Sequence, residues 1–455
     1  MSLKLITLFV LTIFASSLFF PQVTVSAQTF PCQMSKKQFL LETSTYNGSI
    51  TEERGVKYIN LSMACLSHPM GMTFDSERRC VWITLYPSCA NPEAIFGIAK
   101  VDLASITITV FHFPYQVDSN YKGAMPWTIA VADNGELWIS IRGYLVNPSH
   151  PPSEIPYLAK LNPENFTLAI FYIPRELGAG CDVKCYNSYV WYMTCYGLSK
   201  IDYGTEEIVE FYEAEFYDGF MEVDSSSLWL SSVECGFVAR FNTITETFDL
   251  NLTGFERPLG LEADENYVYV AENVKASPTE TENGTIALIN KTNYAVTRIT
   301  VSEIDNGGLF YVHKTENGDI WWTDNSQHVG AFSLISNTIV SPVVYQSKPY
   351  CYFMVEVPAG SSEIWFSCKG SAYVGIIPVN PYDVDGDGKV DEKDVTQTAK
   401  AIGAVLITEP TDPRYGEYWH IKHCHTCPHP SKCDVDRNGK IDKADLLAII
   451  QNRDK

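Results

Sequence analysis

Two short acidic segments near the end of the chain carry oxygen-bearing side chains at the spacing of a calcium-binding loop. In the first segment, loop positions 1, 3, 5, 7, 9 and 12 are Asp383, Asp385, Asp387, Lys389, Asp391 and Asp394. In the second segment, the same positions are Asp434, Asp436, Asn438, Lys440, Asp442 and Asp445. Ca²⁺ is a hard cation that takes about six to eight oxygen ligands, and the residue at position 7 contributes its backbone carbonyl. The spacing predicts two calcium sites, against the plainer interpretation of solvated acidic loops.

A second group of metal-capable side chains lies between these loops, in segment 419–433. Its members are His420, His423, Cys424, Cys427, His429 and Cys433. A Cys-x-x-Cys pair with nearby histidines can hold Zn²⁺ in tetrahedral coordination. In an exported protein such a pair more often oxidises to a disulfide. The sequence leaves zinc and a disulfide both open.

The rest of the chain carries no motif that specifies a reaction. It contains no Gly-x-Ser-x-Gly elbow, no His-Glu-x-x-His zinc helix and no phosphate-binding loop. With 54 acidic against 33 basic residues, its net charge of −21 argues against nucleic acid or an anionic membrane as a partner. A hydrophobic fraction of 45% excludes global disorder. These numbers indicate an acidic globular protein.

A repeated β unit must position any site in the first four fifths of the chain. Seven segments consist of three apolar or aromatic residues followed by a small residue. They lie at 81–84, 137–140, 191–194, 228–231, 268–271, 320–323 and 364–367. Their central aromatic residues recur about every 47 residues between Trp82 and Trp365, which is the period of a four-stranded propeller blade. The repeat predicts an all-β, seven-bladed propeller.

The two ends of this repeat predict how the ring closes and where the protein is located. The last unit ends near residue 378 without a fourth strand, whereas the orphan segment 55–61 reads as a strand. Pairing the two would remove two open edges, so we expect segment 55–61 to close the last blade. Residues 1–27 read as a secretory signal peptide with an apolar run and a Val-Ser-Ala cleavage site, the alternative being an uncleaved anchor. We find no later membrane segment and expect a secreted protein associated with the cell surface.

Export permits disulfides, and the cysteine positions suggest three within blades. The expected pairs are Cys65 with Cys89, Cys181 with Cys195, and Cys351 with Cys368. Cys32, Cys80, Cys185 and Cys235 have no predicted partner. Six Asn-x-Ser/Thr sequons, at Asn47, Asn60, Asn165, Asn251, Asn283 and Asn290, mark expected surface loops of a glycoprotein.

The repeated unit resembles that of streptogramin (virginiamycin B) lyases and NHL-type propellers, over about residues 65–379. The pattern is Pro69, Gly71, Asp75 and Trp82 in the first unit and Pro258, Gly260, Asp264 and Tyr269 in the fifth. For the lyases the resemblance implies a magnesium ion with histidine and glutamate side chains on one face of the ring. The residues at comparable places are His68, Glu272, His313 and Asp324. Their plainer interpretation is as loop residues and turn caps, because a shared fold does not carry chemistry.

The C-terminal part resembles a type I dockerin domain, over about residues 380–452. Each acidic loop precedes apolar residues at helical spacing, at 395–406 and 446–450, and aspartate takes position 12. The resemblance implies calcium-dependent docking onto a cohesin-like protein, with loop positions 10 and 11 helping to select the partner. Those positions are Glu392 and Lys393 in one loop and Lys443 and Ala444 in the other, so the two copies differ.

We therefore expect a propeller over residues 28–379 and a dockerin-like calcium domain over residues 380–455. The first hypothesis is a secreted, calcium-binding propeller with a binding or scaffold role, which takes a carbohydrate or small-molecule ligand and docks onto a cell-surface protein. The alternatives are a tethered lyase-like or carbohydrate-active enzyme and a structural cell-envelope protein. Histidines and carboxylates converging at one mouth of the ring would favour catalysis, and an aromatic or bare funnel would favour binding.

Overall fold

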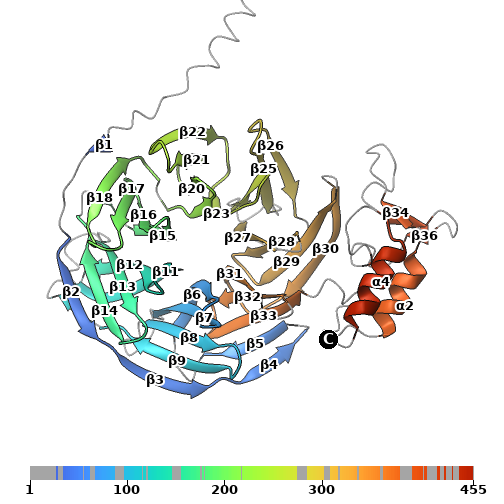
Figure 1. The fold of residues 1–455 in the computed structure, drawn as a ribbon, viewed down its shortest axis with the longest axis horizontal. Helices are drawn as coiled ribbons and strands as arrows, with labels where there is room; N and C mark the ends of the chain where they lie inside the picture. Colours follow the sequence, from blue (N-terminus) through green and yellow to red (C-terminus); the bar gives the residue numbers. More distant parts are fainter. Residues whose placement is uncertain are drawn as a thin grey trace, which may run out of the picture.

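The computed structural model describes most of the chain between residues 27 and 453. The described ranges are 27–28, 34–54, 56–61, 67–87, 97–114, 116–118, 121–145, 155–174, 177–178, 180–216, 218–273, 284–301, 308–315, 318–335, 338–358, 362–379, 392–402, 404–406, 418–420, 425–426, 433 and 440–453. Seven antiparallel sheets stand around a common axis and form a seven-bladed propeller (Figure 1). The predicted fold class is confirmed for the ring.

Each blade has four antiparallel strands, which follow one another in the chain in blades 1 to 6. We number the blades in chain order of their inner strands. The inner strands are β6 (Ser67–Asp75), β11 (Tyr121–Val131), β15 (Gly180–Tyr186), β19 (Met221–Asp224), β23 (Pro258–Ala263), β27 (Leu309–Lys314) and β31 (Cys351–Pro358). The second strands are β7 (Cys80–Pro87), β12 (Leu137–Leu145), β16 (Tyr189–Thr194), β20 (Ser227–Ser232), β24 (Tyr267–Glu272), β28 (Asp319–Asp324) and β32 (Ser362–Cys368).

The outer half of each blade is built in the same way. The third strands are β8 (Gly97–Asp102), β13 (Ile155–Asn162), β17 (Gly197–Asp202), β21 (Phe237–Asn242), β25 (Thr285–Asn290), β29 (His328–Ile335) and β33 (Tyr373–Val379). The fourth strands are β9 (Thr107–His112), β14 (Thr167–Tyr172), β18 (Ile208–Glu213), β22 (Thr247–Thr253), β26 (Val296–Thr300), β30 (Thr338–Gln346) and β5 (Val56–Asn60). In blade 2 the short strand β10 (Gln116–Asp118) also pairs with β11.

The repeated aromatic residue on each second strand is buried in its blade. Trp82 and Trp138 have no exposed surface, and Trp191 and Trp229 retain 1%. In these four blades the residue paired with the tryptophan on the third strand is Lys100, Lys160, Lys200 or Arg240. Each cation lies 5.7–5.9 Å from the centroid of the indole ring, a distance at which the aromatic face attracts positive charge. The sequence repeat therefore encodes a buried ring and a cation that covers it.

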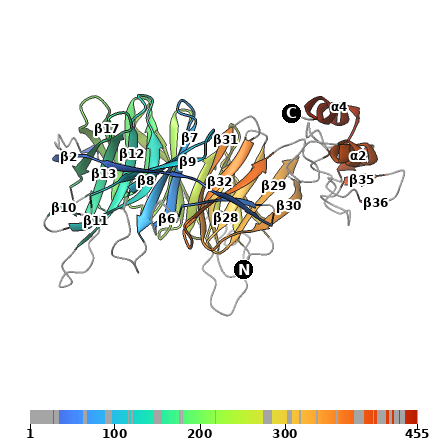
Figure 2. The ribbon, with the colours of Figure 1, turned by 90° about the horizontal axis from the view of Figure 1, so that it is seen from below.

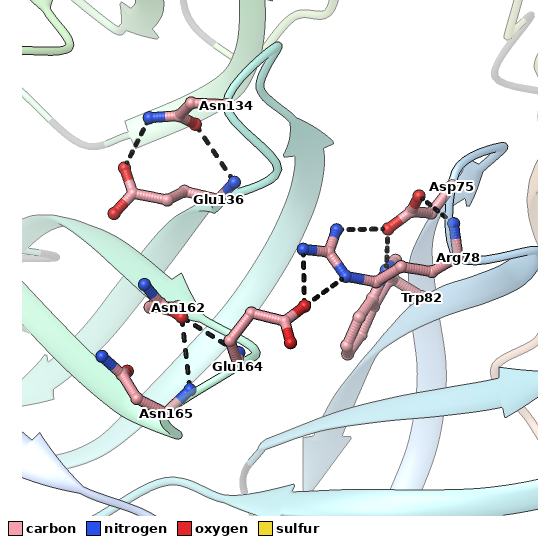
Figure 3. Close-up of polar contacts among 8 residues, drawn as sticks. All are labelled: Asp75, Arg78, Trp82, Asn134, Glu136, Asn162, Glu164 and Asn165. Carbon is pink, nitrogen blue, oxygen red and sulfur yellow. Dashed lines mark hydrogen bonds and ion pairs between the residues drawn. The ribbon is translucent and has the colours of Figure 1, made fainter.

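Ion pairs between neighbouring turns join one blade to the next (Figure 3). Arg78, in the first turn of blade 1, donates to Asp75 at 2.9 Å and to Glu164 of blade 2 at 3.0 Å. The indole of Trp82 donates to the same Asp75 carboxylate at 3.1 Å. Asp75 is 3% exposed, so this turn couples the surface ion pair to the buried motif. Lys160 and Glu206, whose charged atoms are 2.5 Å apart, join blade 2 to blade 3.

The N-terminal segment closes the ring and then encircles part of it. Strand β5 pairs with β33, with Tyr373 opposite Asn60, and so supplies the fourth strand of blade 7, as the sequence predicted. The preceding strands pair in turn with the outer strands of four blades. They are β4 (Ile50–Glu53) on blade 7, β3 (Glu42–Asn47) on blade 1, β2 (Lys36–Leu40) on blade 2 and β1 (Ala27–Gln28) on blade 3.

We call β1 to β4 the belt. Figure 2 shows the belt crossing the outer side of the ring. Blades 4, 5 and 6 carry no fifth strand among the described residues. The sequence analysis predicted the closing strand but missed the belt, because short polar strands such as β4 have no buried face and hence no clear alternation.

The predicted within-blade disulfides are absent where the structure describes both cysteines. The Sγ atoms of Cys181 and Cys195 lie 3.9 Å apart, far beyond the ~2.05 Å of a disulfide, so both cysteines are thiols. A register shift in β15 at Cys181 removes the direct pairing that we expected. Cys351 and Cys368 are directly opposite each other but are also free thiols, and Cys351 Sγ donates to the Lys348 carbonyl at 3.4 Å. Cys65 and Cys89 lie outside the described residues.

The C-terminal part contains two short helices outside the ring (Figure 1). Helices α2 (Glu392–Ala401) and α4 (Lys443–Asn452) contact each other, and each begins near the end of a predicted calcium loop. We expected the first helix to reach residue 406, but residues 404–406 form β34 (Ala404–Leu406) in a small sheet with β35 (Tyr418–His420) and β36 (His425–Thr426). Within the described ranges, no helix has the length and apolarity needed to cross a membrane.

Candidate axial site

One register position on the inner strands differs systematically between blades. In every blade the motif aromatic residue of the second strand has a single partner on the inner strand. These partners, from blade 1 to blade 7, are Thr73, Ala130, Lys184, Glu222, Glu262, His313 and Val355. Blades 3 to 6 therefore place ionisable side chains at equivalent positions around the axis, and blades 1, 2 and 7 do not.

Contacts link these side chains across three blade interfaces. Lys184 Nζ donates to Glu222 Oε2 at 2.8 Å, and His313 Nδ1 lies 2.7 Å from Glu262 Oε2. On its other side, His313 Nε2 lies 3.9 Å from the carboxylate of Glu356 in blade 7. We call Lys184, Glu222, Glu262, His313 and Glu356 the axial cluster. Five consecutive blades contribute one member each.

Burial and neighbouring charges shift the protonation of the cluster. Burial alone would lower the pKa of His313, but the carboxylates of Glu262 and Glu356 outweigh it and raise that pKa to about 9. Burial also opposes the charged form of Lys184, yet Glu222 and other neighbours hold its pKa well above the usual value. Burial raises the pKa of Glu222, although Lys184 opposes this shift. At neutral pH, His313 is therefore an imidazolium and Lys184 an ammonium.

Solvent reaches the axial cluster. The exposed fractions of the side chains are 24% for Lys184, 17% for Glu222, 17% for Glu262 and 19% for His313, against 8% for Glu356. A fully buried structural network would show fractions near zero. These side chains therefore keep some accessible surface that a ligand could contact.

Aromatic side chains seal the axis on one side of the cluster. Phe310 and Phe353 lie on the inner strands of blades 6 and 7, and Phe220 lies immediately before the inner strand of blade 4. Each precedes the cluster residue of its blade by two or three positions. Their ring centroids are 5.4–5.7 Å apart in each pairing, and none of the three is more than 8% exposed. With Met70 and Tyr352 they form one packed group, which we call the aromatic layer. It separates the axial cluster from the end of the ring where the inner strands begin.

The four residues that the lyase resemblance suggested are not brought together. Only His313 belongs to the axial cluster, and no hydrogen bond or ion pair between described residues joins any two of the four. Glu272 is 1% exposed, pairs with Arg298 at 2.9 Å and accepts the Glu256 amide at 2.9 Å. His68, on the inner strand of blade 1, is partly buried, and burial together with Lys369 lowers its pKa.

Asp324 caps a turn. Its fully buried carboxylate accepts from the Ser326 and His328 amides, at 3.0 and 2.8 Å. It also contacts His328 Nδ1 at 2.7 Å, and Ser326 Oγ lies 3.3 Å from the same nitrogen. A catalytic triad needs the acid and the nucleophile on opposite nitrogens of the imidazole, so this Asp-Ser-His group is a structural cap.

Most of the predicted metal ligands lie outside the described residues. These are Asp383, Asp385, Asp387, Lys389, Asp391, Asp434, Asp436 and Asn438 of the calcium loops, and His423, Cys424, Cys427 and His429 of the insertion. Asp394 and Asp445, at position 12 of each loop, are fully buried, whereas Lys440 is exposed. His420 lies opposite His425 in the small sheet, and Cys433 is buried. Among the described residues, no group of three or more His, Cys, Asp or Glu side chains could hold a metal.

The sequence analysis missed Lys184, Glu222, Glu262 and Glu356. Aligning the seven units on their aromatic residue, and reading its partner on the preceding strand, would have found the first three. The quoted pattern around Pro258 and Asp264 passes directly over Glu262. Nothing in the spacing alone marks Glu356, which lies one residue beyond the equivalent position in blade 7.

Comparisons with known proteins extend only to the fold. No protein-family model matches this chain, and no curated protein matches it. Among solved structures, the extracellular domain of BT4673 from B. thetaiotaomicron, described as a hybrid two-component system, is similar with 13% identity and a TM-score of 0.50, over 71% of this chain and 42% of that chain. This chain therefore spans less than half the length of that protein.

Two further solved structures are similar at lower scores. Hydrazine synthase from Kuenenia stuttgartiensis has 13% identity and a TM-score of 0.49, over 69% of this chain and 96% of that chain. The WD40 β-propeller domain of Doa1 has 10% identity and a TM-score of 0.47, over 74% and 97%. At such identities the likeness concerns the fold alone. Any function must be argued from the site.

Proposed function

We propose that this protein is an exported ligand-binding propeller. The axial cluster takes a small molecule, and the C-terminal part binds calcium and docks the ring to a cell-surface partner. The observation that carries the first proposal is the set of five ionisable side chains that consecutive blades place around a solvent-accessible axis. The aromatic layer beside them gives the site a closed, apolar end.

The fold itself does not require charge at this position. Blades 1, 2 and 7 place Thr73, Ala130 and Val355 there and pair equally well with their aromatic residues. Replacing buried ion pairs with apolar side chains is often neutral or stabilising, because desolvation of the charges is costly. A group of charges that stability does not demand is a functional-site candidate.

Binding is better supported than catalysis. A general base works best when its pKa lies near the operating pH, whereas His313 is held as an imidazolium by a pKa of about 9. Lys184 is likewise held in its charged form and paired with Glu222. A tethered lyase-like or carbohydrate-active enzyme finds less support, because three of its four candidate residues lie outside the axial cluster.

A ligand screen with matched variants tests the axial site. Residues 28–455 would be screened against amines, sugars and organic acids by thermal shift, since a ligand that binds the folded state raises the Tm. Ligands that stabilise the wild type should lose their effect in Glu262→Gln and keep it in the control Thr73→Val. Thr73 occupies the equivalent position in blade 1. Hits that survive in Glu262→Gln, Lys184→Met and Glu356→Gln alike would place the site elsewhere and overturn the proposal.

Calcium binding by the C-terminal part is supported by its two helix starts. The carboxylates of Asp394 and Asp445 have no exposed surface, and buried carboxylates need compensation by hydrogen bonds or cations. Asp445 accepts the Asp442 amide at 2.8 Å, and Asp442 in turn caps α4 by accepting the Ala444 amide at 2.7 Å. This arrangement orders the end of the second loop. Zn²⁺ at the Cys/His insertion stays a prediction.

Removal of calcium provides the test. Chelation of residues 28–455 should abolish a separate C-terminal melting transition, and added Ca²⁺ should restore it, because binding stabilises the folded form. Mg²⁺ at the same concentration is the control. Combined Asp383→Asn and Asp434→Asn substitutions should remove the response. A melting profile that is indifferent to Ca²⁺ and chelator would contradict calcium binding.

Docking is supported by the outer face of α4. Leu447 and Ile450 are 55% and 45% exposed, and they lie three residues apart on one side of the helix. The corresponding residues of α2, counted from the buried aspartates, are Thr396 and Ala399. The two helices therefore present different faces, which favours a single docking orientation. Leu447→Lys should abolish calcium-dependent capture of a cohesin-like protein, and Thr396→Lys should not.

A further inference from the structure

The axial cluster contains more acid than base. Three carboxylates, from Glu222, Glu262 and Glu356, face two cations, Lys184 and His313. A fourth carboxylate, Asp182, lies on the same strand as Lys184 and is 4% exposed. Asp182 accepts the Val183 and Met221 amides, both at 2.8 Å. When these carboxylates are ionised, they outnumber the two cations of the cluster.

An entering positive charge would lower the electrostatic free energy of this site. Burial raises the pKa of both Asp182 and Glu222, which means that the surroundings disfavour the carboxylates as they stand. A cation close to them would compensate. An anion would instead meet the excess of carboxylates, and a neutral ligand would leave the imbalance unchanged.

An aromatic ring borders the same group of charges. The Tyr311 ring centroid lies 5.5 Å from that of Phe353 and 6.4 Å from that of Phe220, at the edge of the aromatic layer. Tyr311 is partly exposed, whereas both phenylalanines are buried. Burial raises the pKa of the Tyr311 hydroxyl group, and the nearby charges of Lys184, Glu222 and Glu262 also act on that pKa. Aromatic faces attract organic cations, and such contacts commonly recognise substituted ammonium groups.

Glycine at position 260 lets Tyr311 take this place. A Cβ atom added to Gly260 would lie 2.5 Å from the Tyr311 ring and 2.8 Å from its Cα atom. Any larger residue at position 260 would push Tyr311 away from Glu262. Glu262 lies two positions after Gly260 on the inner strand of blade 5. The close approach of these two strands therefore brings the carboxylate and the aromatic ring to one side of the site.

A metal ion fits these residues poorly. Hard cations need several converging oxygen ligands, and no such group exists among the described residues. Lys184 and His313 would also repel a divalent ion placed between the carboxylates. An organic cation spreads its charge over a larger surface and tolerates these neighbours.

We infer that the axial site recognises an organic cation, through the carboxylates of Glu222, Glu262 and Glu356 and the Tyr311 ring. This inference rests on the proposed function and names the ligand class of the same site. Lys184 and His313 act as internal counter-ions that keep the carboxylates ionised and apart.

The test compares cations with neutral molecules of the same shape. Binding of choline, agmatine and putrescine to residues 28–455 would be measured by calorimetry, beside 3,3-dimethyl-1-butanol, the uncharged carbon analogue of choline, and MgCl2. We expect at least one cation to bind more than tenfold tighter than dimethylbutanol. Glu356→Gln should weaken that binding about tenfold and Tyr311→Leu should weaken it less, while Thr73→Val leaves it unchanged.

The outcomes separate this inference from the proposed function. Equal binding of choline and dimethylbutanol, or binding of Mg²⁺ alone, would overturn the cation class while retaining an axial site. If none of the three cations bound, but sugars or acids bound in a way that depends on Glu262, the cation class would again be overturned and the axial site retained. Failure of every compound in both screens would overturn both proposals. Glu356→Gln is preferred over Glu262→Gln because its contact with His313 is the longer one, so its fold is easier to preserve; circular dichroism would verify it.

Discussion

Two groups of blades, which share blade 3, differ from the basic repeat: one group at its outer edge and the other at its inner edge. Blades 7, 1, 2 and 3 carry an extra outer strand from the belt, whereas blades 3 to 6 carry ionisable residues at the inner position opposite the motif aromatic. The core between these positions is the same apolar sandwich in every blade. The comparison teaches that the repeated unit fixes the blade, while its two edges are free to acquire separate tasks.

Removing the closing strand should have the largest effect, because the ring should then fail to fold. Deletion of residues 28–61 takes away β5 and leaves β33 without its partner, so the chain should fail to give a cooperative melting transition. Deletion of residues 28–47 removes β1 to β3 only and should leave a folded ring with a lower Tm. Differential scanning calorimetry of both truncations would decide this. Equal behaviour of the two would mean that closure by β5 does not matter.

Neutralising one partner of the ion pair between Lys184 and Glu222 should have the next largest effect on stability. Lys184→Met leaves Glu222 without its cation and should destabilise the protein by about 3 kcal/mol, since breaking a mostly buried pair costs more than the pair contributes. The double substitution with Glu222→Met should recover most of that loss. Thr73→Val, at the equivalent place in blade 1, should change stability by less than ~0.5 kcal/mol. Urea unfolding would provide these values, and no recovery in the double variant would argue against direct coupling.

The imidazolium of His313 should make stability depend on pH in the alkaline range. Its pKa is about 9 in the folded protein and 6.5 in an ordinary environment. A raised folded-state pKa stabilises fully below the lower value, and the contribution disappears as the pH rises through the higher one. We expect a loss of about 2 kcal/mol between pH 6.5 and 9, reduced from the full linkage value by partial exposure. In His313→Gln that slope should be absent, and an identical slope in both proteins would assign it to other groups.

The ion pairs between neighbouring turns should contribute least to the free energy of unfolding. Glu164 is 74% exposed where it meets Arg78, so Glu164→Gln should cost about 0.5 kcal/mol or less. Glu206→Gln, which breaks pairs with Lys160 and with Lys36 of the belt, should cost about 1 kcal/mol. Raising the ionic strength should reduce the first effect more than the second. A larger effect at Glu164 would mean that the Asp75 turn depends on it.

The sequence predicted the elements whose pattern is set by burial. The seven aromatic strands and the closing strand were predictable because a buried face imposes a fixed alternation. The belt strands β2 and β4 were not, since their side chains are mostly exposed and their stability comes from backbone pairing to an existing edge. His313 was found only through resemblance. Its partners Glu262 and Glu356 lie about 50 and 43 residues away in sequence and meet only in the closed ring.

The thiol pairs show the limit of register arguments. Cys351 and Cys368 were correctly expected to lie opposite each other. Their thiols interact without a covalent bond, and each also has another partner, such as the Ser347 hydroxyl 3.8 Å from Cys368 Sγ. Strand pairing fixes the distance between backbones, but a covalent bond also depends on side-chain rotamers that neighbouring loops control.

The pairing of β5 with β33 has a consequence for biogenesis. Its two partners are separated by about 310 residues of chain, so a strand that is made early during synthesis must wait for one that is made late. Contacts of such long range slow folding and leave strand edges available for wrong association in the meantime. The nascent chain would thus remain an open ring until β33 has been made, and its assembly should depend on chaperones that shield the unpaired strand edges.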